Sequence, residues 1–123
     1  MNLGDTILAT HLWVVCSTPT QDGEAVIFNL TTRRRDSDTN CVIVAGEHPF
    51  VKKESVIAYE RGQLMNVQQW VKAQNLGAKI YAPVSPGLLF RIQQGALKSD
   101  LTPQKLQQIV KQSLISDPAK RTP

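Results

Sequence analysis

The chain has two histidines, His11 and His48, whose imidazoles are the side chains best suited to proton transfer near neutral pH. His11 begins one long apolar run, and His48 follows another. If both runs are neighbouring strands, the imidazoles lie at one rim, where one accepts a proton while the other donates one. Thr32 and Arg33, at the end of a third run, add a hydroxyl and a fixed positive charge. This set predicts metal-independent transesterification of RNA, in which arginine stabilises the charge that builds on phosphorus.

Two clusters of basic residues accompany these candidates, Arg33 to Arg35 in one and Lys52 with Lys53 in the other. They supply five of the fourteen lysines and arginines in a chain with a net charge of +4. A basic patch of this kind attracts phosphate groups, so we predict that Arg34, Arg35, Lys52 and Lys53 hold an RNA backbone. The alternative for the arginine triplet is an ordinary solvated loop.

Motifs of other chemistries are missing from the sequence. The chain contains no glycine-rich phosphate loop, no Gly-x-Ser-x-Gly elbow, no His-Glu-x-x-His motif and no Cys/His spacing of a zinc site. We therefore expect no metal and no cofactor. The alternative for His48 is a structural role, in which it orders its loop while Phe50 anchors the loop in the core. For Trp13 and Trp70, packing in the core is favoured over the stacking of bases.

The N-terminal half predicts a small antiparallel barrel or a strongly coiled sheet. Apolar, β-branched runs cover residues 11–17, 24–32, 41–45 and 55–59, after a short element at residues 4–7. Asp22 and Gly23 supply a tight turn between the first two long runs, and residues 33–40 form an exposed loop. Alternation along the first long run places His11, Trp13, Val15 and Ser17 on one face and Leu12, Val14 and Cys16 on the other.

Helices follow in the C-terminal half. Residues 65–76 carry apolar side chains at helical spacing, with Val67, Trp70 and Val71 near one side, and Gly77 ends the pattern. Ser85 and Thr102 each precede a proline, as an N-cap does, and an apolar stripe follows each of them. Residues 79–82 form a short strand or an extended link. The fold class is therefore mainly β with C-terminal helices, an α+β protein whose two or three helices lie against the barrel.

A single domain is expected, because 123 residues suffice for one core. It divides into barrel strands at residues 1–62, a mostly helical part at 63–116 and a frayed tail at 117–123. No apolar run approaches the roughly 18 residues that span a bilayer, and the start lacks a signal segment, so we expect a cytoplasmic protein without a membrane partner. Cys16 and Cys41 lie in strand-like runs, which favours reduced, buried thiols over a disulfide.

Three stretches of the N-terminal half resemble the PemK/MazF family of toxins from toxin–antitoxin modules. They are Gly4-Asp5-Thr6-Ile7, His11-Leu12-Trp13-Val14-Val15-Cys16-Ser17 and Val26-Ile27-Phe28-Asn29-Leu30-Thr31-Thr32. The resemblance implies an SH3-like barrel with appended helices, a homodimer, metal-independent endoribonuclease activity and inhibition by a small antitoxin protein. Thr32 matches the hydroxyl position of the family's active site. His11 stands where the family has an arginine, and Leu12 stands where it has a proline.

The replacement of the family's arginine and proline by His11 and Leu12 leaves three hypotheses open. In the first, the chain is a toxin-like endoribonuclease in which His11, with His48, has taken over proton transfer. In the second, it is a non-catalytic barrel that binds nucleic acid or a protein through the same basic rim. In the third, it is a structural or assembly subunit whose helices after residue 84, which match nothing in the family pattern, contact a partner.

Overall fold

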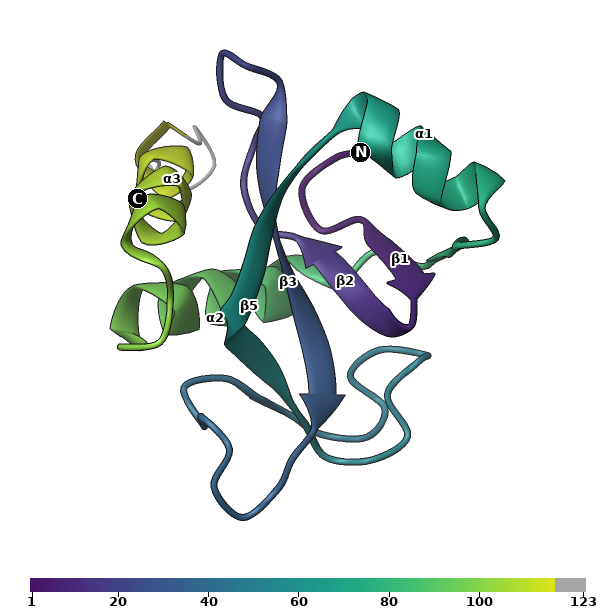
Figure 1. The fold of residues 1–123 in the computed structure, drawn as a ribbon. Helices are drawn as coiled ribbons and strands as arrows, with labels where there is room; N and C mark the ends of the chain where they lie inside the picture. The colour runs from purple at the N-terminus through teal and green to yellow at the C-terminus, as the bar shows by residue number, and fades with distance from the viewer. Residues whose placement is uncertain (117–123) are drawn as a thin grey trace.

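The computed structural model describes residues 1–116, which form six strands and three helices in a mixed α+β fold (Figure 1). The strands are β1 (Thr6–Ala9), β2 (His11–Val15), β3 (Glu24–Thr32), β4 (Val42–Ile43), β5 (Ser55–Asn66) and β6 (Lys79–Tyr81). The helices are α1 (Val67–Asn75), α2 (Pro86–Lys98) and α3 (Gln104–Ser116). No helix in this part of the chain has both the length and the apolar character needed to cross a membrane. The predicted frayed tail, residues 117–123, lies outside the described residues.

All six strands belong to one antiparallel sheet, in the order β4-β5-β3-β2-β1-β6. The register between β3 and β5 shifts between Ile27 and Asn29, and an irregularity of this kind increases the local twist of the strands. The sheet curls into a half-barrel whose two edge strands, β4 and β6, are not neighbours in the hydrogen-bonded order. The predicted α+β fold with a strongly coiled antiparallel sheet is confirmed.

Alternating side chains give the sheet two apolar faces, as predicted for residues 11–17. The main core contains Leu12, Val14 and Cys16, together with Val26, Phe28 and Leu30 of β3. A second, smaller cluster contains Val15, Ala25 and Ile27, with Trp70 of α1 and the partly buried Trp13 packed against it. Helix α1 therefore covers one face of the sheet, while both tryptophans pack in the apolar interior of the protein.

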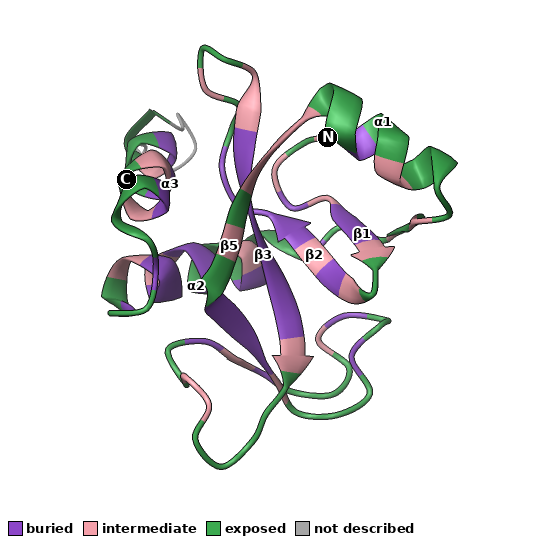
Figure 2. Cartoon of the chain, viewed as in Figure 1, coloured by how far each residue is buried: buried purple, intermediate pink, exposed green. Residues whose placement is uncertain are grey.

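Helices α2 and α3 cover the other face. Leu88, Ile92 and Ala96 of α2 join the main core, as do Leu106 and Val110 of α3, and Figure 2 shows these helices with their buried sides toward the sheet. The predicted cap at Ser85 is confirmed, because its hydroxyl accepts a hydrogen bond from the amide of Leu88 at 3.1 Å. The predicted cap at Thr102 is wrong: α3 begins at Gln104, and the Thr102 hydroxyl is buried without a hydrogen-bond partner.

The strand bounds depart most from the sequence prediction at β5 and β4. The strand predicted for residues 55–59 continues to Asn66, because its second half pairs with the first half of β3 from Glu24 to Ile27. Gly62 permits this pairing, since a Cβ there would lie 2.5 Å from the ring of Phe28. The strand predicted for residues 41–45 shrinks to β4, because the amide of Val44 binds the Glu47 side chain at 2.8 Å instead of a neighbouring strand.

The helix predicted for residues 65–76 is two residues shorter at its start. Asn66 ends β5 and caps α1, and a reciprocal pair of hydrogen bonds with Gln69 forms a capping box. Of the side chains predicted to face inward, only Trp70 is buried, whereas Val67 and Val71 are about half exposed. A single aromatic anchor therefore attaches this helix to the sheet.

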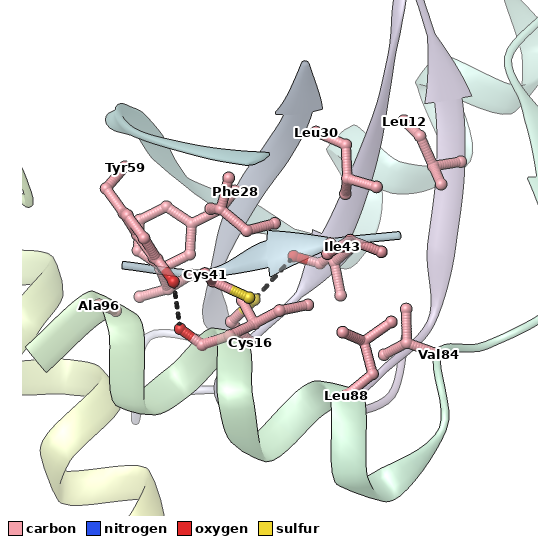
Figure 3. Close-up of a cluster of buried hydrophobic side chains, with 14 of the residues drawn as sticks. Leu12, Cys16, Phe28, Leu30, Cys41, Ile43, Tyr59, Val84, Leu88 and Ala96 are labelled. Carbon is pink, nitrogen blue, oxygen red and sulfur yellow. Dashed lines mark hydrogen bonds between the residues drawn. The ribbon is translucent and has the colours of Figure 1, made fainter. Parts of the chain in front are cut away.

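Tyr59 connects the sheet to α2 in the middle of the main core (Figure 3). Its hydroxyl donates a hydrogen bond to the carbonyl of Ile92 at 2.7 Å, and its ring meets Phe28 edge to face. Gly95 permits the close approach of the helix, because a Cβ at this position would collide with the Tyr59 hydroxyl. Cys16, in the same core, is a free thiol whose pKa is strongly raised by burial. Cys41 is also free and buried, so both cysteines are structural, as predicted.

Residues 44–54, here called the bridging loop, join β4 to β5 and span the open side of the half-barrel. Three contacts connect this loop to the far side of the sheet and to α2. His48 forms a hydrogen bond with the carbonyl of Ala82, the ring of Phe50 lies edge to face with Tyr81, and Glu47 forms an ion pair with Arg91. The loop therefore closes, through side chains, the gap that the edge strands leave open.

Candidate functional site

A cavity of about 390 Å³ lies where β2 begins, β3 ends and β5 begins, beside the bridging loop. The positions follow from the antiparallel pairing: Thr32 is opposite Ser55, and the register that joins Trp13 to Asn29 brings His11 toward the end of β3. We call this cavity the basic pocket. In Figure 1 the loops on either side of β4 leave the sheet at the end of β3, which is the end where the basic pocket lies.

The basic pocket brings together five of the predicted site residues, namely His11, Thr32, Arg34, Lys52 and Lys53. His11 is partly exposed, and the other four are exposed. These residues come from three segments that are far apart in the sequence, and the curl of the sheet unites them. One imidazole, one hydroxyl and three fixed cations therefore face a common space.

The remaining lining supplies hydroxyl groups and an apolar surface. Thr10, Thr31 and Ser55 add hydroxyls, while Leu12, Leu30, Phe50 and Val51 form the apolar part. Among residues 1–116, no aspartate or glutamate lines the cavity. A cationic rim over an apolar surface with hydroxyl donors suits an anion that also presents a flat apolar group, as a nucleotide does.

His48 lies elsewhere, inside the bridging loop. Its side chain is 2% exposed and does not line the basic pocket. The ring Nδ1 accepts a hydrogen bond from the amide of Phe50 at 3.1 Å, so Nε2 carries the proton and donates it to the carbonyl of Ala82. Since both nitrogens have backbone partners, the geometry leaves no free ring nitrogen for a substrate. The structure thus places His48 in the structural role that the sequence offered as an alternative.

Two of the predicted arginines are also outside the basic pocket. Arg33 forms an ion pair with Glu54, and its amide donates to the Glu54 carbonyl at 3.0 Å where β3 ends and β5 begins. Its charge is therefore partly compensated by a neighbouring carboxylate. Arg35 is exposed on the loop after β3, while Arg34 between them lines the cavity. Arg34 is thus the member of the triplet that lines the basic pocket together with His11.

Several residues that line the basic pocket are not among those predicted from the sequence. Thr10 is the most unusual of them. It forms the turn between β1 and β2 and has a φ of 65°, the one positive value among non-glycine residues within positions 1–116. A β-branched residue in this region of backbone space is strained, and such strain is concentrated at functional sites. No glycine or asparagine marks this turn in the sequence. Phe50, the core anchor in the alternative role of His48, is instead 37% exposed and lines the cavity.

Comparison with known proteins adds no assignment: neither a protein-family model, nor a curated protein, nor a solved structure matches this chain. The resemblance to the PemK/MazF family stays a prediction from three short stretches. Among the described residues, no group of three or more His, Cys, Asp or Glu side chains is arranged to hold a metal ion. The basic pocket is therefore the feature of the molecule that points to a function.

Proposed function

We propose that this protein is a toxin-like endoribonuclease that needs no metal and whose active site is the basic pocket. The main support is the gathering of His11, Thr32, Arg34, Lys52 and Lys53 around one cavity that, within the described part of the chain, no carboxylate lines. A phosphodiester needs cations that stabilise its negative charge, and its cleavage needs a proton acceptor near the 2′-hydroxyl of the ribose. The pocket offers both kinds of group.

In the proposed reaction, His11 removes the proton of the 2′-hydroxyl, and the 2′-oxygen attacks the adjacent phosphorus. The bond from phosphorus to the 5′-oxygen breaks, which yields a 2′,3′-cyclic phosphate and a new 5′-hydroxyl. The leaving oxygen takes its proton from water, and His11 returns its proton to the solvent. Arg34, Lys52 and Lys53 stabilise the charge on the phosphoryl oxygens, while Thr32 orients the phosphate through a hydrogen bond.

A toxin-like nuclease of this kind would be controlled by a partner, and we propose a small antitoxin protein that covers the basic pocket. Acidic side chains on such a partner would complement Arg34, Lys52 and Lys53 and exclude RNA from the same surface. A homodimer, expected from the PemK/MazF resemblance, belongs to this proposal as well.

The decisive experiment is cleavage of a labelled single-stranded RNA by the purified protein in EDTA. We expect products that end in a 2′,3′-cyclic phosphate, and no cleavage of the same strand with a single 2′-deoxy substitution at the cut site. Induced expression should arrest growth, whereas the His11→Ala variant should not. Intact RNA after prolonged incubation with wild-type protein would refute the nuclease proposal.

Binding of RNA without cleavage is the second candidate. The observation that favours it is that one imidazole, that of His11, reaches the basic pocket, because His48 is buried with both nitrogens in use. This candidate predicts salt-sensitive RNA binding that Arg34→Gln weakens, and no product from wild-type protein. It also predicts that His11→Ala leaves any effect of expression on growth unchanged.

A further inference from the structure

The side chain of His48 attaches the bridging loop to the sheet at a buried point. Its Nε2 donates to the carbonyl of Ala82, and the same carbonyl accepts a second hydrogen bond from the hydroxyl of Thr6 at 2.9 Å. Thr6 is fully buried in β1, and the next segment is held by a hydrogen bond from the amide of Val84 to the carbonyl of Gly4 at 2.9 Å. His48 is therefore bound to a fixed part of the sheet.

The opposite side of the same ring fixes the wall of the basic pocket. Nδ1 accepts the amide proton of Phe50, whose ring lies 5.5 Å from that of Tyr81 and also lines the pocket. Val51 follows, 3% exposed in the main core, and it is held by its amide, which donates to the carbonyl of His48 at 2.9 Å. Lys52 and Lys53 follow Val51 directly in the chain. The backbone position of both lysines is therefore set by the residues that His48 fixes.

The ion pairs of the loop lie on the surface. Glu47 pairs with Arg91 and Glu54 pairs with Arg33, and exposed ion pairs contribute little to stability. The ring of His48 is buried, and its loss removes the partner of the Phe50 amide and one of the two donors to the Ala82 carbonyl. The imidazole is therefore the buried polar link between the loop and the far edge of the sheet.

We propose that His48 is a positioning residue of the basic pocket, which holds the wall formed by Phe50, Val51, Lys52 and Lys53 opposite His11. A neutral imidazole suits this role because it offers one acceptor and one donor on different sides of a rigid ring. That the ligand of the pocket is RNA rests on the proposed function, whereas the effect of His48 on the bridging loop does not. His48 acts on RNA through the wall, with no contact to the reacting atoms.

Two variants test this role, His48→Asn and His48→Leu. The amide oxygen of asparagine takes the place of Nδ1 and retains the bond from Phe50, whereas leucine fills a similar volume with no polar atom. In His48→Leu we expect KM for a short RNA to rise about tenfold with kcat within threefold of wild type, and the pH profile to keep its shape. In His48→Asn, which retains the bond from Phe50 and loses the bond to Ala82, we expect a smaller rise in KM, of about threefold. The thermal midpoint of each variant shows whether it is folded.

A second measurement needs no RNA. Hydrogen exchange should show the Phe50 amide protected in wild type and in His48→Asn, and exchanging at least tenfold faster in His48→Leu, while amides of β3 keep their protection. Equal protection of Phe50 in all three proteins would overturn the positioning role. A hundredfold loss of kcat in both variants, with a changed pH profile, would also overturn it, because that result marks a proton-transfer group. If wild type neither cleaves nor binds RNA, the proposed function fails and hydrogen exchange still decides the role of His48.

Discussion

The basic pocket and the bridging loop use the same kinds of side chain in opposite ways. In the pocket, the imidazole of His11 and the cations of Arg34, Lys52 and Lys53 face a cavity whose lining, as far as residues 1–116 are concerned, contains no acidic residue. In the loop, the imidazole of His48 is buried with two backbone partners, and the charge of Glu47 is paired with that of Arg91. A polar group that is already satisfied by its own chain stabilises a conformation, while one that faces open space is available to a ligand.

This difference separates chemistry from support within one small protein. The start of β2, the end of β3 and the lysines at 52 and 53 present functional groups, and the buried part of the loop after β4 holds one wall of the pocket in place. Changes in the first region should alter activity and leave stability unchanged, while changes in the second and in its supporting helix should alter stability first. The following experiments test this division.

The largest effect is expected for His11→Ala. Removal of a general base costs about 10²- to 10⁴-fold in rate, so RNA cleavage should fall by at least a hundredfold. Because His11 is partly exposed, the midpoint of urea unfolding should shift little. His48→Asn is the matched control, with near-normal cleavage. If His11→Ala and His48→Asn lost activity equally, the contrast between the two histidines would not hold.

Gly95→Ala tests the supporting side of the comparison. The new Cβ collides with the Tyr59 hydroxyl, which displaces α2 from the core, and overpacking of this kind costs about 2 kcal/mol. Gly87→Ala on the same helix is the control, because nothing lies within 4 Å of a Cβ at that position. Urea unfolding should separate the two variants clearly. Equal stability of both would mean that α2 tolerates displacement and that Tyr59 does not fix it.

The double variant Lys52→Gln with Lys53→Gln measures the electrostatic contribution of the pocket wall. Each phosphate contact to a single strand adds about 0.7 to the slope of log affinity against log salt, so the slope should fall by about 1.4. Affinity at physiological salt should fall roughly tenfold on the same basis, with unchanged stability. Lys72→Gln with Lys79→Gln, at positions that do not line the pocket, should leave both quantities unaltered.

The smallest effect concerns the ion pair of the bridging loop. The hydrogen bond from Arg91 lowers the pKa of Glu47, so the carboxylate stabilises the folded state at pH values above its ordinary pKa near 4.3. This contribution is lost as the pH falls through the lowered pKa. Since the pair is exposed, Glu47→Gln should cost about 0.5 kcal/mol at pH 7 and nothing at pH 2. A cost that persists at pH 2 would point to another cause.

Much of the architecture follows from local patterns in the chain. Apolar alternation in β2 and β3 predicts the two faces of the sheet, and Ser85 with Pro86 predicts the start of α2. Prediction failed where tertiary contacts overrule local chemistry. Residues 60–66 look too polar for a core strand, yet 63–66 pair with β3. Thr102 looks like a cap, yet its hydroxyl has no hydrogen-bond partner among residues 1–116.

The sequence by itself determined which side chains are able to do chemistry: two imidazoles, a hydroxyl at the end of β3 and two basic clusters. It also determined that these groups stand at strand ends, because each of them lies where an apolar run of the sequence starts or finishes. Only the tertiary structure decided which of them share a cavity. His11 and His48 are equivalent as residue types, but one faces the basic pocket, while curling of the sheet draws the other into the gap between β4 and β6. Burial and hydrogen-bond partners are properties of the folded chain, and they give each imidazole its role.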